Sequence, residues 1–512
     1  MLAGLTRAED DVRSRRGLAA WLGGAVLVPG VLLFGACTGS TDTQGAATGG
    51  AAGSGGAAGS GGESQVIHVS PLGNDNADGK SPSTAVLSVG EGIQRALGCV
   101  SKPCEIHLMQ GTYHEQVTLA DGVKIVGGYA PGFVDQDAAK YPVVITSSEP
   151  KTVIADGLTL PTSLASLTVE GADLSERGDG SSSYGIWVRA SGDALSLVNT
   201  SVRGGKGAAG AVGSSGTVTT CSALGGEGGE VDDCSSSAGQ PGDADRDPVS
   251  GGGGGVDGGD NCPSACPSVG SDGVSGGSSG TDGGDGAAGL PGGINSDALG
   301  AFNALGEWVG ALGASGERGK HGTGGGGGGA GGTKRFRACF GCGTLLGGVG
   351  GKGGAGGCAG GGGAPGGPGG GSFAILLVNS NLTLESGFVA GGRGGDGARG
   401  GDGAAGALGA MGAGGEDGGS QKCGAIWYSS AGGAAGGDGG AGGPGGGGAG
   451  GNGGISIGIG LVGKSAVTQG EAVIIDRGTP GKGGPGGQGG NDAQPGVKGE
   501  VWGSKAFALG GP

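Results

Sequence analysis

The chain reads Ile186-Trp-Val188, Leu195-Ser-Leu197 and Val202-Arg-Gly204-Gly-Lys-Gly207, and this pattern returns in its C-terminal third. The second copy is Ile375-Leu-Leu377, Leu382-Thr-Leu384 and Val389-Ala-Gly391-Gly-Arg-Gly394. In each copy two short stretches of alternating apolar residues lead into glycine. A weaker third copy runs from Ile459 and Leu461 to Val473. Self-similarity of this kind predicts the coils of a solenoid, each of which buries its apolar face against its neighbours.

Glycine dominates the rest of the chain. It accounts for 146 of the 512 residues, roughly four times its usual share of about 7%. No strict Gly-X-Y period persists and proline is only 20 residues, which argues against collagen. We expect the tracts 204–371 and 391–454 to be insertions on one side of the solenoid. Two conformations stay open for them: packed three-fold extended helices, because glycine lacks a Cβ, or mobile loops, because ordering glycine costs entropy.

The start of the chain has the features of an export signal. Arg13, Arg15 and Arg16 precede an apolar stretch over 18–34, which ends in Gly35-Ala-Cys37. This predicts a secretory signal peptide, and the Cys after Gly-Ala resembles a bacterial lipobox, although Phe34 departs from that motif. The resemblance implies a lipid on Cys37. An ordinary secreted protein and a retained membrane anchor remain the alternatives.

Residues 38–63 are almost entirely Gly, Ala, Ser and Thr, and we expect them to form a flexible tether. Such a tether would hold a folded body just off a membrane. In a Gram-negative cell, Thr38 after the lipid-bearing Cys would resemble an outer-membrane sorting signal. The expected location is therefore the cell envelope, at the outer membrane or cell surface. The net charge of −16 argues against a nucleic-acid partner.

Cysteine usage agrees with export. Eleven Cys minus Cys37 leave ten, enough for five disulfides in an oxidising compartment. Close spacing favours four local pairs and leaves two residues over: Cys99/Cys104, Cys221/Cys234, Cys262/Cys266 and Cys339/Cys342, with Cys358 and Cys423 remaining. Zinc is the competing interpretation of the third and fourth pairs, but these pairs lie far apart in the chain and the compartment is oxidising. No metal or cofactor site is therefore predicted.

Residues 64–203 show strand and helix patterns. Apolar spacing predicts one short helix in this region, over 88–97. It predicts a second, amphipathic helix inside the first glycine-rich insertion, over 296–312. Short strands without regular hairpin turns favour a parallel β-helix over a sandwich. They are expected at 66–70, 105–109, 116–119, 123–126, 143–146, 152–154 and 166–169.

Three motifs in this region carry a resemblance. They are Val69-Ser-Pro71-x-Gly73-Asn-Asp75, Ile106-His-Leu108…Gly111-Thr-Tyr113-x-Glu115, and Gly127-Gly-Tyr129. They resemble the opening of pectin-lyase-like right-handed parallel β-helix proteins, in particular an uncharacterised bacterial subset found on surface proteins. The resemblance covers about 64–205 and implies the fold. Members include polysaccharide lyases and hydrolases but also adhesins, so it does not imply one function. The glycine tracts resemble PE-PGRS repeats in composition, although the amino-terminal module of that family is missing.

Candidate chemistry is sparse. An enzyme of the resembling superfamily would present acids and a basic residue from neighbouring coils on one groove. The residues considered for such a groove are Asp156, Asp173, Asp179, Arg177, Arg189 and Arg203. No spacing singles them out, so the catalytic residues are unknown. Asp-rich stretches at 230–233, 243–247 and 282–285 are considered as calcium ligands, but the repeat typical of calcium-binding β-rolls is not sustained.

The sequence therefore predicts an all-β protein, a right-handed parallel β-helix with long glycine-rich insertions. Its expected parts are a lipoprotein signal (1–37), the tether (38–63), cap and β-helix (64–203), a Cys-containing insertion (204–371), one coil (372–390), a second insertion (391–454), and a final coil with a glycine-rich tail (455–512). The expected role is structural or adhesive, with a matrix, polysaccharide or cell-surface partner. A polysaccharide lyase or hydrolase is the alternative.

Overall fold

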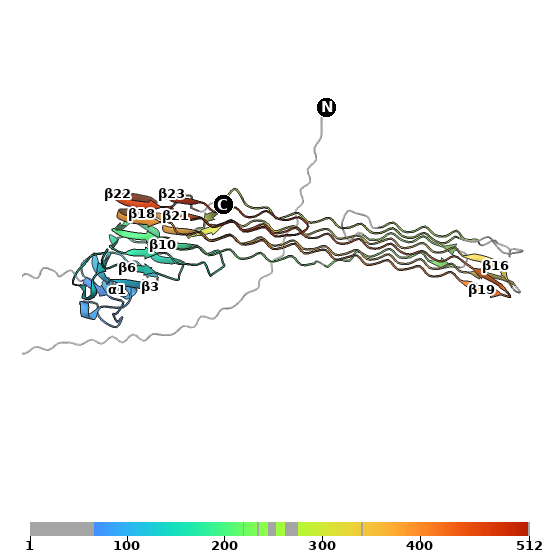
Figure 1. The fold of residues 1–512 in the computed structure, drawn as a ribbon, viewed down its shortest axis with the longest axis horizontal. Helices are drawn as coiled ribbons and strands as arrows, with labels where there is room; N and C mark the ends of the chain where they lie inside the picture. The colour runs from blue at the N-terminus through green and yellow to red at the C-terminus, as the bar shows by residue number, and fades with distance from the viewer. Residues whose placement is uncertain are drawn as a thin grey trace, which may run out of the picture. The chain divides into compact units, whose positions relative to one another are not determined.

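A computed structural model describes residues 66–218, 220–232, 235–243, 252–261, 275–338 and 341–509. The signal, Cys37 and the tether lie outside these residues. The chain divides into two compact units, 1–61 and 62–512, and every described residue belongs to the second. The described part of this unit is predominantly β, with one α-helix and two 3-10 turns (Figure 1).

The elements follow in chain order. Those up to the glycine tracts are β1 (Val66–Val69), η1 (Pro82–Thr84), α1 (Val89–Leu97), β2 (Cys104–Met109), β3 (Gly111–His114), β4 (Val117–Thr118), β5 (Val123–Tyr129), η2 (Pro131–Phe133), β6 (Val143–Thr146), β7 (Lys151–Asp156), β8 (Thr162–Ala165), β9 (Thr168–Glu170), β10 (Ser183–Val198) and β11 (Thr200–Arg203). The later ones are β12 (Val231–Asp232), β13 (Ser235–Ser236), β14 (Gly300–Phe302), β15 (Trp308–Gly310), β16 (Lys334–Ala338), β17 (Gly341–Leu345), β18 (Ser372–Ala390), β19 (Ser420–Cys423), β20 (Ile426–Ser429), β21 (Ser456–Val462), β22 (Ala466–Asp476) and β23 (Val501–Phe507).

Fifteen strands form one parallel sheet. Their pairings make three columns, which the long strands β10 and β18 connect. The first column runs β1, β2, β5, β8, the end of β10, the middle of β18 and β22. The second runs β4, β7, β10, β18, β21 and β23. The third runs β3, β6, β9, β11, β18 and β22. Apolar residues from all three columns share one buried core.

The sequence copies lie side by side in register. Ile186 pairs with Ile375, which pairs with Ile459, and Val202 pairs with Val389. The third copy ends two residues later than predicted, because a bulge in β22 places Ile475 rather than Val473 opposite Val389. A fourth copy, β23, was not predicted, because Ser504 and Ala506 take the positions that Ile459 and Leu461 hold in β21.

The helix predicted at 88–97 is confirmed as α1. Ser88 is its N-cap, with its hydroxyl accepting the amide of Glu91 at 3.2 Å. The apolar face formed by Val89, Ile93 and Ala96 is buried in the core. Five of the predicted strands match observed strands to within two residues at each end, and the strand predicted at 123–126 extends three residues further as β5. The strand predicted at 166–169 appears as the shorter β9, preceded by an unpredicted β8.

The helix predicted at 296–312 is wrong. This segment is the antiparallel hairpin β14–β15, with Phe302 opposite Trp308. Gly300 and Gly306 have positive φ, +159° and +75°, which an α-helix does not allow. Both aromatic rings are buried against Tyr184 and Phe373 of the sheet, so packing overrides the helical spacing.

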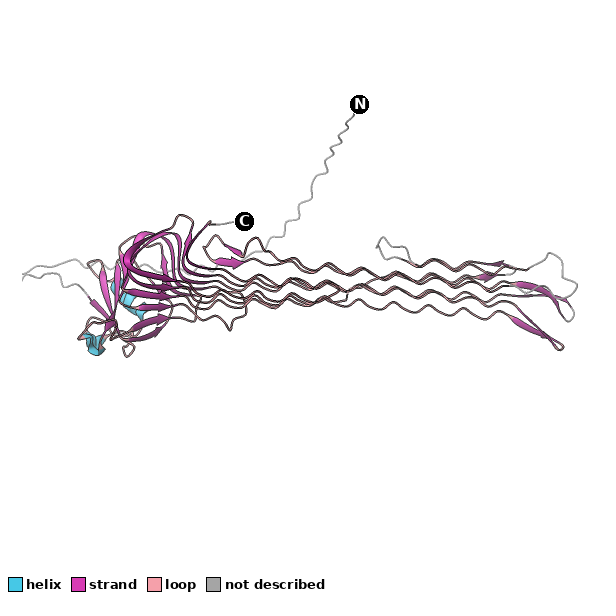
Figure 2. Cartoon of the chain, turned by 45° about the horizontal axis from the view of Figure 1, so that its top comes forward, coloured by secondary structure: helices cyan, strands magenta, loops and turns pink. Residues whose placement is uncertain are grey.

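The glycine tracts are ordered. They form ten extended runs between the sheet and the hairpins, which lie side by side in Figures 1 and 2. We name them run 1 (204–230), run 2 (237–243), run 3 (252–261), run 4 (275–294), run 5 (311–333), run 6 (346–371), run 7 (391–419), run 8 (430–455), run 9 (477–489) and run 10 (493–500). Residue 219 of run 1 is not among the described residues.

Hydrogen bonds between runs recur at every third residue. The amides of Gly351, Gly354 and Gly357 in run 6 donate to Ala434, Gly437 and Gly440 in run 8. A three-residue period is that of an extended three-fold helix. Of the two conformations left open by the sequence, the packed one is therefore found.

The share of glycine in a run rises with the number of other runs packed against it. Run 5 is hydrogen-bonded to six other runs, and its residues 321–333, nine of which are glycine, are buried. The amides of Gly325, Gly326 and Gly327 point in three directions, to runs 6, 4 and 2. At the start of run 1, which lies at the edge, glycine is needed only at every third residue, as in Gly207-Ala-Ala-Gly210. At most glycines of the runs an added Cβ would lie within 3 Å of a neighbouring backbone, which is why a larger residue is excluded there.

Candidate functional site

The charged residues considered for catalysis form a ladder of ion pairs. Asp156 accepts from the Nε of Arg189 at 2.9 Å, and Asp173 accepts from the Nζ of Lys206 at 2.7 Å. Glu170 lies 3.4 Å from the Nη1 of Arg203. Each pair is separated by 33 residues and joins neighbouring parallel strands or the loops that extend them.

The remaining two candidates are held by backbone groups. Asp179 accepts the amide of Ser181 at 2.9 Å, and Arg177 donates to the carbonyl of Ser148 at 2.8 Å. The hydrogen bond from Arg189 lowers the pKa of Asp156, which keeps that carboxyl ionised. The structure thus places four of the six candidates along the ladder and two outside it, and does not gather them into one site.

The ion pair of Asp173 predicts a pH dependence. Hydrogen bonds from Lys206 and Ser175 lower its pKa to about 2. Because the folded pKa is depressed, the stabilisation is present above the ordinary value of 3.8 and is lost as the pH falls towards 2. Asp173 is half-exposed, so Asp173→Asn is expected to cost less than about 1 kcal/mol at pH 6. Urea unfolding at pH 6 and pH 2.5 measures this, and a difference from wild type that does not shrink at pH 2.5 would contradict it.

Glu115, which follows the strand end of the Gly111-Thr-Tyr113 motif, holds the cap helix. Its two carboxylate oxygens accept the amides of Val89 and Gly90 at 2.7 and 2.9 Å. The carboxylate of Asp75 accepts the preceding amides of Leu87 and Ser88 at 2.8 and 2.9 Å. The motifs that carry the family resemblance therefore satisfy the first amides of α1.

Glu115→Gln is expected to lower the free energy of unfolding by about 1–2 kcal/mol, because one of the two acceptors becomes an amide donor facing an N–H. Chemical denaturation measures the loss. Glu91→Gln is the matched control, since it removes only the exposed pair with Arg95 on the same helix and should cost about 0.5 kcal/mol or less. Equal losses for the two variants would contradict a capping role for Glu115.

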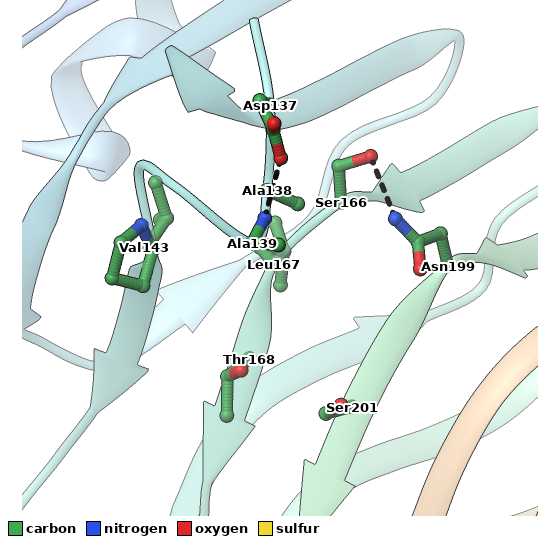
Figure 3. Close-up of a pocket in the computed structure, with 10 residues that line it drawn as sticks. Asp137, Ala138, Ala139, Val143, Ser166, Leu167, Thr168, Asn199 and Ser201 are labelled. Carbon is green, nitrogen blue, oxygen red and sulfur yellow. Dashed lines mark hydrogen bonds between the residues drawn. The ribbon is translucent and has the colours of Figure 1, made fainter. Parts of the chain in front are cut away.

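A pocket of about 330 Å³ opens beside the turns at Ser166 and Asn199 (Figure 3). Three segments line it: the loop before β6, the β8–β9 junction and the β10–β11 junction. The lining residues are Asp137, Ala138, Ala139, Pro142, Val143, Ser166, Leu167, Thr168, Asn199 and Ser201. Thr168 and Ser201 pair in register on adjacent strands, so their side chains share one face.

The corner fixes the polar groups of the pocket. Ser166 and Asn199 have φ of +56° and +45°, a left-handed conformation that turns the chain between columns one and three. The amide nitrogen of the Asn199 side chain lies 3.4 Å from the hydroxyl of Ser166, and Asp137 accepts the amide of Ala139 at 2.9 Å (Figure 3). Neighbouring backbone thus holds these groups in place.

The pocket chemistry is that of a neutral polar ligand. Its lining offers three hydroxyls and one carboxamide, and Asp137 is its single charged residue. Glycoside hydrolysis typically uses two carboxyl groups, one on each side of the scissile bond, and this lining supplies one. Beyond Ser201 the next residue in register is Phe388, a partly buried aromatic ring on the same face.

Sequence reasoning missed this pocket. The signal that would have found it is an interval of 33 residues, which separates Ser166 from Asn199 and Thr168 from Ser201. That interval becomes visible only once strands are paired, since Ser, Thr and Asn alone match no motif.

A second exposed surface lies on the hairpin β19–β20. The side chains of Ile426 and Trp427 are 59% and 65% exposed, and the Nζ of Lys422 lies 5.4 Å from the centre of the Trp427 ring. Large exposed apolar side chains close together are typical of contact surfaces.

Two of the aspartates considered for calcium, Asp282 and Asp285, accept the backbone amides of Asp438 and Ala441 at 2.8 and 2.7 Å. Asp396 and Asp402 of run 7 accept those of Lys482 and Gln488 in the same way, at 2.8 and 2.7 Å. They satisfy amides of the runs at points where no carbonyl faces them. In the part of the chain that the structure describes, no group of three or more His, Cys, Asp or Glu is arranged to hold a metal ion.

Two disulfides have both of their cysteines among the described residues. Cys99–Cys104 matches the predicted pair. The predicted pair Cys221/Cys234 is wrong, because Cys221 is joined to Cys358, far along the chain in run 6. Run 1 is extended, so Val231 just past its end lies roughly 30 Å from Cys221 at about 3.1 Å per residue, whereas run 6 lies beside it. Cys423 is also disulfide-bonded. Cys234, Cys262, Cys266 and Cys339, and the side chain of Cys342, lie outside the described part.

Among the described residues, no helix has the length and apolar character needed to cross a membrane. Comparison with protein-family models, with curated proteins and with solved structures finds no match to this chain.

Proposed function

We propose that this chain is an exported surface protein, anchored by a lipid on Cys37, that binds a neutral polysaccharide in an adhesive or structural role. The pocket beside Ser166 and Asn199 is the observation that carries the proposal. It presents hydroxyl and carboxamide groups from adjacent strands, with Phe388 beside them. Sugars are recognised by such groups, and an aromatic ring packs against their apolar face.

The fold proposed for the sheet is a right-handed parallel β-helix. Three parallel columns support it, as does the interval of 33 residues by which β7, β8 and β9, one strand in each column, are all separated from their partners in β10 and β11. In this arrangement runs 1–6 and runs 7–8 are insertions, at the same corner, into coils that otherwise continue. The domain boundaries predicted from the sequence follow from the same proposal.

Charge favours a neutral over an acidic polysaccharide. The chain carries a net charge of −16, and the single charged residue of the pocket is a carboxylate. Both would repel uronic or sulfated sugars at low salt. This is the opposite preference from a site built to hold a polyanion.

The binding test uses the purified chain from Glu63 to Pro512 against immobilised neutral and acidic polysaccharides. Retention on a neutral polymer is expected, and Thr168→Val combined with Asn199→Ala should weaken it at least tenfold. Thr383→Val combined with Asn381→Ala is the matched control, since Thr383 is a half-buried residue of the first column outside the pocket. Binding that survives the pocket variant but is lost in Trp427→Ala would move the site to the hairpin β19–β20.

The same assay addresses the alternative of a lyase or hydrolase. New chain ends released from a polysaccharide would establish cleavage and refute a purely binding role. The anchor is tested separately, because Cys37→Ser is expected to release the protein from membranes. Unchanged membrane retention of that variant would contradict the lipid anchor and leave the binding proposal standing.

A further inference from the structure

The hydrogen bonds between glycine runs do not by themselves define one register. Runs 1 and 6 are antiparallel, and the amides of Gly350, Gly353 and Gly356 donate to Gly229, Gly226 and Ala223. Both runs repeat Gly-Gly-x here, with Gly225-Gly-Glu and Gly228-Gly-Glu in run 1. A slip of one triplet therefore places glycine on glycine again, and register in glycine-rich strands is weakly specified for this reason.

The ion pair between these runs also survives a slip. Lys352 lies 2.7 Å from Glu227, and both side chains are about two-thirds exposed. Glu230 occupies the equivalent place one triplet later. The pair thus favours both registers, and solvent screens it in either.

Run 1 has a point where such a slip would be absorbed. From Gly207 to Gly216 its amides donate to run 7, whereas those of Gly226 and Gly229 donate to run 5. Between residues 217 and 223, a stretch that contains no glycine, run 5 thus replaces run 7 as the acceptor of these amides, while run 6 donates to run 1 on both sides. This crossing separates the distal part of run 1 from the part that the sheet anchors at Arg203.

Cys221 and Cys358 lie at this crossing. Their pairing continues the series of bonded residues that joins Ala223 to Gly356, and their Cα atoms are 5.3 Å apart. One triplet of an extended three-fold helix spans about 9 Å, and a disulfide bridges Cα atoms up to about 6.8 Å apart. The bond is therefore compatible with one register and incompatible with either neighbouring one.

We propose that the Cys221–Cys358 disulfide is a register pin, which selects one alignment of the distal part of run 1 from alignments that differ by whole triplets. The hydrogen bonds among the glycine runs hold any one alignment rigid, and the disulfide selects which alignment forms. This inference concerns the glycine runs and is independent of the proposed ligand.

Moving one cysteine by one triplet tests the pin. In the double variant Cys221→Ser with Leu224→Cys, a disulfide from position 224 to Cys358 requires a slip by one whole triplet. Leu224 is 65% exposed, so its side chain is dispensable for packing. We expect mass spectrometry of the oxidised, digested protein to find this bond in most molecules. Unoxidised thiols at positions 224 and 358 in a folded protein would overturn the proposal, because the hydrogen bonds among the runs alone would then fix the register.

A second variant keeps the test valid if the moved cysteine perturbs folding. In Cys221→Ser with Cys358→Ser, the amides of Gly226, Gly229, Gly353 and Gly356 are expected to exchange with deuterium at least tenfold faster than in wild type. The amides of Gly207 to Gly216 should be unchanged, since they lie on the anchored side of the crossing, and those of β10 and β18 report that the sheet is folded. Wild-type protection at all four glycines would overturn the pin.

Discussion

Gly327→Val is expected to lower the free energy of unfolding by about 3 kcal/mol or more and to disrupt the packing of the glycine runs. Gly327 lies in the middle of run 5, where a Cβ would stand 1.9 Å from the carbonyl oxygen of Glu227. Its own amide donates to Gln240, and its carbonyl accepts from Gly255, each at 2.8 Å. Runs 1, 2 and 3 would all have to move, which places the variant at the severe end of overpacking.

Ala405→Val is the control for this substitution. Ala405 is exposed at the edge of run 7, beyond the last contact of that run with run 1. Its Cβ already points into solvent, so the larger side chain should change the free energy of unfolding by about 0.5 kcal/mol or less. Urea denaturation followed by circular dichroism measures both variants. A Gly327→Val protein as stable as Ala405→Val would contradict the packing of run 5.

Ile375→Ala is expected to lower the free energy of unfolding by about 2–5 kcal/mol. Ile375 is fully buried in β18 and lies between Ile186 of β10 and Ile459 of β21. Its truncation leaves a cavity that strands held by hydrogen bonds on both sides cannot close. Thermal or urea unfolding measures the loss.

Ile474→Ala removes the same atoms from β22, where the side chain is 65% exposed. We expect a change of about 0.5 kcal/mol or less. Similar losses at positions 375 and 474 would mean that the copies do not stack around a common core.

The parallel sheet was predictable because the apolar repeats survive in the sequence. Ile186, Ile375 and Ile459 occupy equivalent places and pair as expected. β23 was not predicted because Ser504 and Ala506 occupy the positions where the other copies have large apolar residues. The hairpin at 300–310 was mistaken for a helix because Phe302, Leu305, Val309 and Leu312 have helical spacing. Their environment, the aromatic surface of β10 and β18, is contributed by residues that are distant in the chain.

The glycine runs were undecidable from composition alone. The same Gly-Gly-x repeat serves a mobile loop and a packed run, and the difference lies in whether a neighbour is present. The structure supplies the missing rule. Residues 404, 407, 410 and 413 of run 7 are all alanine, in the region past its last bond with run 1. Where run 1 lies beside it, the equivalent residues 392, 395 and 401 are glycine, because a Cβ there would meet run 1. Residue 398 at the same phase is alanine, so the change from Gly to Ala follows the departure of the neighbour at three of these four positions.

Amide hydrogen exchange on the oxidised chain tests this account most directly. If the glycine runs form a hydrogen-bonded bundle, residues 322–333 of run 5 exchange as slowly as the core of β18, because their amides are buried and bonded to runs 2, 4 and 6. Exchange of these glycines at the rate of an unstructured peptide, with β18 still protected, would contradict the bundle. The runs would then be loops on a parallel sheet, and the Cys221–Cys358 disulfide would have no hydrogen-bonded bundle whose register it could fix.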